Sequence, residues 1–360
     1  MPSAKTKNKQ PLWDQLADAD LLQGTPPEIG ESDSPWYIKL LLALSGWIAA
    51  LFLFAFIATG FADILENRLA AFITGGLLIA IAFALLRLPK NEFLQHLMLA
   101  VSLTGQALMV FAIYADTTQD KLVYVWGMIT IMQLLLALMM PDFVHRVWSA
   151  FATAIALSIT LKFLDLPAIE SAVILFLSCW LVLNEFHYPT QIRKFQALSY
   201  GFILALIALK SVALFTYHPI NWITGTSATT PYPWLDELLL AAVMLYLVFN
   251  LIQRHQKPLF TIFTLTTVLA TLLLCALSMQ AQGITVAMAI MILGFSASNS
   301  ILLSLGIVSL LFYSSSYYYQ LHASLLDKSQ TLLILGCVLL ILRYLLLRFR
   351  ADKKETPHAS

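Results

Sequence analysis

Charged residues are scarce in this chain. Only 11% of the 360 residues are Asp, Glu, Lys or Arg, whereas 59% are apolar, and the mean hydropathy is +0.80. A soluble domain carries about 25% charged residues, because it must cover its own surface. No basic run interleaved with aromatic residues indicates a nucleic-acid partner. The composition therefore indicates a protein whose main partner is the lipid bilayer.

Sequence motifs of catalysis and metal binding are also missing. The chain has no Walker lysine loop, no GxGxxG after a strand, no HExxH and no GxSxG, and its seven histidines are scattered over loops and tails. Cys179, Cys275 and Cys337 lie inside apolar runs without CxxC or Cys/His spacing, so we expect small, buried side chains. We therefore expect no catalytic residue, no metal and no cofactor.

Long apolar runs fill most of the sequence. Between residues 37 and 347, apolar runs alternate with a few polar residues about twelve times. A bilayer core of about 30 Å is crossed by roughly 20 helical residues, so each run predicts a membrane span. We predict an all-α polytopic membrane helix bundle with about 12 transmembrane helices. The predicted spans are 37–59, 69–86, 93–114, 122–140, 147–163, 168–183, 197–215, 235–252, 259–278, 283–295, 301–319 and 331–347.

Lys and Arg are distributed unevenly between the two faces of this bundle. Basic residues near short loops are retained on the cytoplasmic side of a membrane. With the N-terminus in the cytoplasm, most of the 21 basic residues fall on the cytoplasmic face. The exceptions are Arg68, Lys121, Lys162, Lys210 and Lys328. A single span over 283–319 would place the basic C-terminal residues outside, so we predict an even number of spans and two cytoplasmic termini.

Residues 1–35 form a separate cytoplasmic segment before the bundle at 36–347, and residues 348–360 form a basic cytoplasmic tail. Leu12, Trp13 and Leu16 share one face of a short predicted amphipathic helix, and Gly24 is a plausible end for it. The acidic polar face is poorly suited to anionic lipid headgroups. The apolar face therefore packs on the protein's own cytoplasmic loops or docks a membrane or envelope protein partner.

A few polar residues lie within the predicted spans. Lys210 lies close enough to the external end of its span to snorkel, and Asp236 and Glu237 suit a helix N-terminus. Gln106 and Gln133 are more central, and their depths differ by only about 4–5 Å at 1.5 Å per residue. An amide alone in hydrocarbon is unfavourable, so we predict that the two bond to each other. They serve either helix packing or a substrate path.

The connection at 294–300 is the second candidate polar region. The span before it has only about 13 residues, or roughly 20 Å of helix, against a hydrocarbon core of about 30 Å. Irregular backbone at such a depth is tolerated only inside protein or beside a water-filled cavity. Ser296, Ser298, Asn299 and Ser300 therefore either line a small cavity open to the cytoplasm or form an ordinary surface turn.

Several segments carry a family resemblance. The Leu12-Trp13 leader precedes SPWYIKLLLALSGWIAALF at 34–52, and GFSASN at 294–299 precedes YYYQL at 317–321 and LLDKS at 325–329. Together they resemble the bacterial integral-membrane family called domain of unknown function 4401, over nearly the whole chain. The resemblance implies a bacterial inner-membrane location and brings no activity or catalytic residue.

Two kinds of function are compatible with these features. We expect a non-enzymatic protein that acts in transport or as a membrane scaffold for envelope proteins. The alternative is a membrane-embedded glycosyl or lipid-linked transferase that uses the external loop 216–234. That loop contains no Arg or Lys to hold a diphosphate, so its aromatic residues fit an interfacial belt better.

The predicted orientation is tested with reporter fusions. Fusions after Lys257 and Lys354 are expected to report the cytoplasm, and fusions after Asp120 and Ser227 the external side. A cytoplasmic signal at Ser227 would overturn the whole assignment.

Overall fold

The computed structural model describes residues 36–60, 66–87, 92–115, 117–118, 121–214, 233–254, 262–279 and 282–319, with isolated positions between 326 and 340. These residues form α-helices and short 3-10 turns, without a strand. The helices are α2 (Trp36–Gly60), α4 (Arg68–Leu85), α5 (Glu92–Tyr114), α6 (Leu122–Met139), α7 (Phe143–Phe163), α8 (Glu170–Asn184), α9 (Ile192–Leu214), α11 (Pro233–Arg254), α12 (Ile262–Ser278), α13 (Ile284–Ser296) and α14 (Ser300–Tyr319). The 3-10 turns are η2 (Pro167–Ile169), η3 (Glu185–His187) and η4 (Pro189–Gln191).

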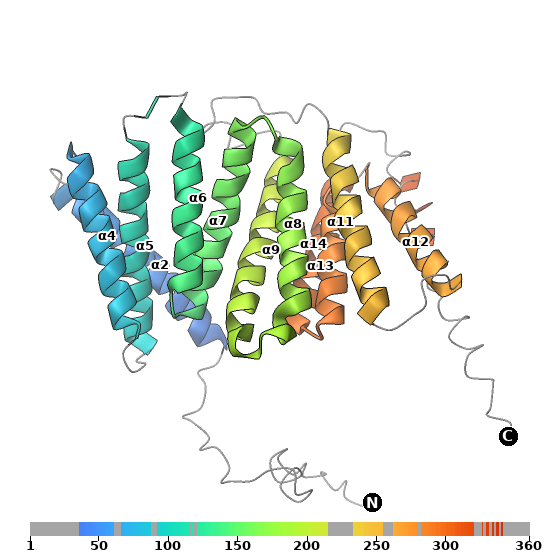
Figure 1. Cartoon of the computed structure of the whole chain (residues 1–360), viewed down its shortest axis with the longest axis horizontal. Helices are drawn as coiled ribbons and strands as arrows, with labels where there is room; N and C mark the ends of the chain where they lie inside the picture. Colours follow the sequence, from blue (N-terminus) through green and yellow to red (C-terminus); the bar gives the residue numbers. More distant parts are fainter. Residues whose placement is uncertain are drawn as a thin grey trace, which may run out of the picture.

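Most of the helices stand side by side in a row that runs from α4 to α12, while α9, α13 and α14 lie behind this row near α8 and α11 (Figure 1). Eight helical segments within the described ranges are long and apolar enough to cross a membrane. Each predicted span from 37–59 to 301–319 coincides with one described helix. This confirms an all-α, multi-pass architecture. The total of twelve spans and the cytoplasmic position of both termini stay predictions.

Two helices begin earlier than the sequence predicted. α7 begins at Phe143 instead of residue 147, and α9 begins at Ile192 instead of residue 197. The reason is that polar residues occupy the first turn of each helix, where the hydropathy of the span is still low. Residues 1–35, with Leu12, Trp13 and Leu16, lie outside the described residues, as do most of the loop 216–234 and the tail 348–360.

Short polar side chains cap the first turns of α4 and α7. Asn67 Oδ1 accepts hydrogen bonds from the backbone N–H groups of Leu69 and Ala70 at the start of α4. Asp142 Oδ2 accepts from the N–H of His145 at 2.9 Å and so begins α7. Such N-caps satisfy donors that a helix leaves unpaired, and each contributes about 1 kcal/mol.

The main apolar core lies among α7, α8, α9, α11 and α13. Helices approach closely there because small residues lie at the contacts. A Cβ on Gly201 of α9 would lie 2.5 Å from the Cβ of Ala150 on α7, and one on Gly294 of α13 would lie 2.3 Å from the backbone N of Leu303 on α14. Tyr313 of α14 is fully buried and donates a hydrogen bond to the carbonyl of Ile207 on α9.

The first three helices form a group of their own. α5 packs extensively on α4 and on α2, which runs obliquely across the row (Figure 1). The next pair, α6 and α7, also packs tightly, whereas α5 touches α6 only sparsely. α2 and α5 therefore form one side of a weakly packed boundary, and α6 and α7 form the other side. We call this boundary the seam.

Two expectations for single side chains are wrong. Lys210 does not snorkel, because its side chain is only 6% exposed and forms ion pairs with Asp236 and Glu237 on α11. Cys179 and Cys275 are buried as expected, but Cys337 is exposed. An apolar run in a membrane protein is compatible with lipid contact as well as with burial, so hydropathy alone does not place this thiol.

The crossing of α4 and α5 allows a test of close packing. Gly75 and Gly105 face each other, and a Cβ on either would lie 2.6 Å from the carbonyl oxygen of the other. Gly75→Ala is expected to lower the free energy of unfolding by about 1–3 kcal/mol, measured by denaturant titration in detergent micelles. Gly76→Ala is the matched control, because nothing lies within 4 Å of a Cβ there. Equal effects of the two substitutions would contradict the packing.

Candidate functional site

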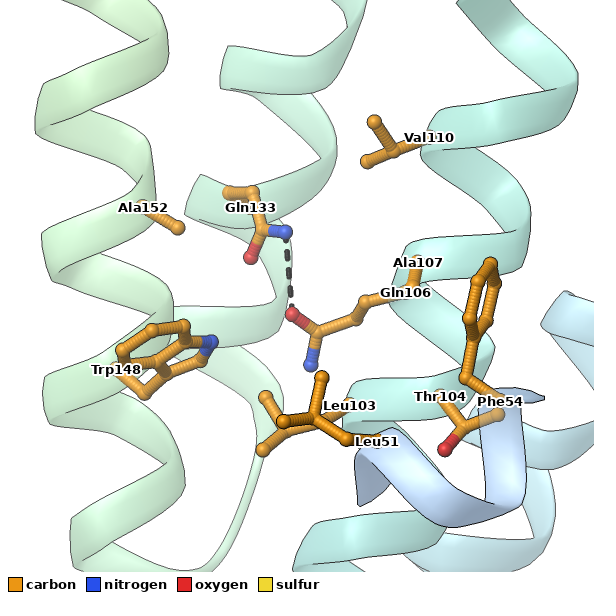
Figure 2. A pocket seen from close by; sticks show the side chains of 10 residues that line it. All are labelled: Leu51, Phe54, Leu103, Thr104, Gln106, Ala107, Val110, Gln133, Trp148 and Ala152. Atoms are coloured by element: carbon orange, nitrogen blue, oxygen red, sulfur yellow. Dashed lines mark hydrogen bonds between the residues drawn. The ribbon is translucent and has the colours of Figure 1, made fainter. Parts of the chain in front are cut away.

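A cavity of about 520 Å³ lies at the seam. Its volume falls within the range of about 300–1,000 Å³ that small-molecule sites occupy. Side chains from α2, α5, α6 and α7 line this seam cavity (Figure 2). The lining residues are Leu51, Phe54, Leu103, Thr104, Gln106, Ala107, Val110, Gln133, Trp148 and Ala152. The cavity therefore lies where α5 has few contacts with α6 and where α2 runs obliquely past α5 (Figure 1).

The walls of the seam cavity are mostly hydrocarbon. Aliphatic and aromatic side chains form most of the lining, and the side-chain amides of Gln106 and Gln133 are its most polar groups. Both glutamines are buried, with relative exposures of 3% and 5%. A largely apolar pocket with a few placed polar groups is the usual form of a ligand site, because the polar groups fix the orientation of the ligand.

The two glutamines bond to each other across the seam. Gln133 Nε2 on α6 donates to Gln106 Oε1 on α5 at 3.1 Å (Figure 2). This confirms the contact predicted from their similar depths on neighbouring antiparallel helices. An amide in hydrocarbon has few partners other than another side chain, so the bond links two helices that otherwise touch little.

His145 of α7 continues this chain of hydrogen bonds. Its side chain is fully buried, and its Nε2 lies 3.2 Å from Gln106 Nε2 and 2.7 Å from Ser102 Oγ. The amide nitrogen of Gln106 only donates, so Nε2 of the imidazole accepts the hydrogen bond from Gln106. The ring proton of the neutral imidazole then lies on Nδ1. Nδ1 then donates to Ser149 Oγ at 3.3 Å. The chain therefore runs in one direction, from Gln133 through Gln106 and His145 to Ser149.

One acceptor at the start of this chain is unpaired. Gln133 Oε1 is buried and has no hydrogen-bond partner among the described residues. In Figure 2 this oxygen lies on the side of the amide that faces Trp148, away from Gln106. A buried carbonyl that has no hydrogen-bond donor lowers the stability of the folded protein by about 1–3 kcal/mol. The seam cavity therefore offers both space for a hydrocarbon group and an acceptor for a hydrogen-bond donor.

Sequence reasoning missed three members of this network. Ser102, His145 and Ser149 were not candidates, and the expectation that every histidine lies in a loop or tail is wrong for His145. Polar residues four positions apart lie on one face of a helix. The spacings of Ser102 with Gln106 and of His145 with Ser149 are therefore the signal that indicates the network.

The turn between α13 and α14 is built mainly by its own backbone. Ser298 has a φ of 53°, and the N–H of Asn299 donates to the carbonyl of Gly294 at 2.8 Å, which closes the end of α13. Asn299 Oδ1 accepts from the first N–H groups of α14, and its Nδ2 donates to the hydroxyl of Tyr200 on α9. The side chains of Ser296, Ser298 and Ser300 are exposed.

These contacts give Asn299 a role in capping α14 and in docking it on α9. None of Ser296, Ser298, Asn299 and Ser300 lines the seam cavity. A separate cavity open to the cytoplasm at this turn stays a prediction.

The bond between the glutamines is tested with a double-mutant cycle of Gln106→Leu and Gln133→Leu. A coupling of about 0.5–2 kcal/mol in the free energy of unfolding is expected, because each single substitution already removes the shared bond. Gln106→Leu with Thr130→Val is the control pair, since the Thr130 hydroxyl contacts the carbonyl of Trp126 and the hydroxyl of Thr160 rather than Gln106. Strict additivity in the glutamine cycle would mean that the amides do not interact.

Comparison with known proteins places the chain in a family. A family model described as a domain of unknown function (DUF4401) matches residues 35–349, which include every described helix. Neither the curated proteins nor the solved structures gave a match. The matched segment covers far more than half of the sequence, and this chain belongs to the DUF4401 family.

Proposed function

We propose that this protein is a non-enzymatic transport component of the bacterial inner membrane that binds a small amphiphile in the seam cavity. The observation that carries the proposal is a cavity of about 520 Å³ with an unpaired, buried Gln133 oxygen at its wall. Both termini are assigned to the cytoplasm, as the distribution of Lys and Arg favours.

The chemistry of the ligand follows from the lining. Leu51, Phe54 and Val110 offer dispersion contacts to a hydrocarbon chain or ring. Gln133 Oε1 needs a donor, which a hydroxyl, an amide N–H or an amine supplies. An amphiphile with one such donor satisfies both requirements, whereas a fully charged solute has no counter-charge among the residues that line the cavity.

The packing around the cavity favours transport over simple lipid storage. The helices on each side of the seam pack tightly within their own group and sparsely across it. Relative movement of two such groups changes the contacts at the seam most, and many transporters expose their site by rocking one group of helices against another. The Gln106 and Gln133 bond then acts as a link that opens and closes with this movement.

The alternatives rest on other parts of the chain. A scaffold would use Leu12, Trp13 and Leu16, and a transferase would use the loop 216–234. Both regions lie wholly or largely outside the described residues, and no contact among the described helices favours either role over the seam cavity.

The proposal is tested by purifying the full chain in a mild detergent and analysing retained molecules by native mass spectrometry. The wild type is expected to retain an amphiphile that Ala107→Phe excludes by filling the cavity. Gln133→Leu is expected to lower the affinity about tenfold, because it removes a hydrogen bond of about 1–1.5 kcal/mol. Leu135→Phe, at an exposed position of α6, is the matched control and is expected to retain the molecule.

Transport of the retained molecule is then measured in proteoliposomes. The wild type is expected to exchange it between leaflets faster than Ala107→Phe does. Equal retention by the wild type and Ala107→Phe would refute binding in the cavity, and retention without faster exchange would refute transport.

A further inference from the structure

A second buried polar cluster lies where α7, α8, α9 and α11 meet. Lys162 Nζ lies 3.7 Å from Glu170 Oε2. Lys210 Nζ contacts Asp236 Oδ2 directly and lies 3.7 Å from Glu237 Oε1. These five residues are called the charge cluster. Their side chains are between 3% and 16% exposed, so each charged group is largely desolvated.

Hydroxyl groups on α7, α12 and α13 lie around the charge cluster. Ser158 on α7 donates to Glu170 Oε2 at 2.5 Å. Thr285 Oγ1 on α13 lies 3.4 Å from Glu237 Oε2 and 2.7 Å from Ser278 Oγ on α12. α7, α12 and α13 therefore each contribute a hydroxyl group to the surroundings of the charge cluster.

Irregular backbone reaches the level of the charge cluster. α13 has only 13 residues, and it begins after Gly283, which has a φ of 93°. A Cβ on Gly283 would lie 2.8 Å from the ring of Tyr313, so glycine is needed there for both its conformation and its size. Tyr313 lies six residues, or about 9 Å, before the end of α14. Gly283, which precedes the first residue of α13, therefore lies inside the bundle, close in sequence to Thr285, which bonds to Ser278.

The charges of the cluster do not balance. Two lysines face three carboxylates, which leaves one negative charge in excess when all five groups are ionised. A buried charge without a partner is strongly unfavourable. Two carboxylate oxygens, Asp236 Oδ1 and Glu237 Oε1, are also buried without a hydrogen-bond partner among the described residues. The excess charge and the open acceptors therefore coincide on the same two side chains.

We propose that the charge cluster binds one monovalent cation, either a proton or Na⁺, at Asp236 and Glu237. A proton on a carboxyl oxygen and a sodium ion held by carboxylate and hydroxyl oxygens neutralise the excess charge equally well. A divalent metal is a poorer fit, because no group of three His, Cys, Asp or Glu side chains converges within the described part of the chain. None of these residues lines the seam cavity, so this site does not depend on the proposed function.

The experiment measures thermal unfolding of the full chain in detergent, with NaCl or N-methylglucamine chloride at equal ionic strength, between about pH 6 and pH 9. If the cation is Na⁺, sodium raises the unfolding temperature of the wild type by about 2–4 °C or more. If it is a proton, sodium has no effect, and stability falls as the pH rises, because the folded protein holds a proton that the unfolded chain releases.

Glu237→Gln removes the excess charge and is expected to abolish either dependence. It is also expected to be at least as stable as the wild type at alkaline pH without sodium. Asp236→Asn makes the same test if Glu237→Gln does not fold. Lys210→Met increases the excess charge and lowers stability, and adding Glu237→Gln to it restores the charge of the wild type and recovers stability.

Asp165→Asn is the matched control, since Asp165 is an exposed carboxylate in the connection between α7 and α8. It is expected to keep the sodium or pH dependence of the wild type. A wild type that is insensitive to both, together with a Glu237→Gln variant that is less stable under every condition, would overturn the cation site and leave an ion-pair network alone.

Discussion

A polar group that leaves water for hydrocarbon must find a partner, and this constraint accounts for the interior of the protein. The apolar helices supply few hydrogen-bonding side chains, and those that bond across helices form two main clusters. One is the chain of hydrogen bonds that includes Gln106, Gln133 and His145, and the other is the charge cluster around Lys210 and Glu237. In each place the pairing is incomplete by one acceptor or one charge.

These incomplete pairings lie where helix packing is interrupted. The Gln133 oxygen without a partner lies beside the seam, where α5 and α6 separate. The two carboxylates that each have one unpaired oxygen lie near the start of α13, where Thr285 contacts Glu237. Elsewhere small residues such as Gly201 and Gly294 allow backbones to approach closely, and little space is left. At these two places an interruption in packing and an unpaired acceptor coincide, as expected where a protein binds something that its own chain does not provide.

Sequence reasoning predicted what depends on one helix or on two adjacent ones. Hydropathy predicted each described helix, and counting residues from a short connection predicted the contact of Gln106 with Gln133. It failed where several helices meet. Lys210 was expected to snorkel because it lies near the end of its own span. Its ion-pair partner Asp236 lies on another helix, α11, and the sequence of the span alone does not indicate it. His145 was missed because its Asp142 cap begins α7 earlier than hydropathy indicates. The seam cavity depends on how helices diverge, which no local pattern reports.

The central claim is that the seam cavity holds an amphiphile whose polar end pairs with Gln133. The most direct measurement is a cryo-electron microscopy map of the full chain in lipid nanodiscs prepared from the native membrane. The account predicts elongated density between α2, α5, α6 and α7, with its polar end within hydrogen-bonding distance, about 3 Å, of Gln133 Oε1. A seam closed by protein side chains, or density that ends in hydrocarbon without reaching this oxygen, would contradict it.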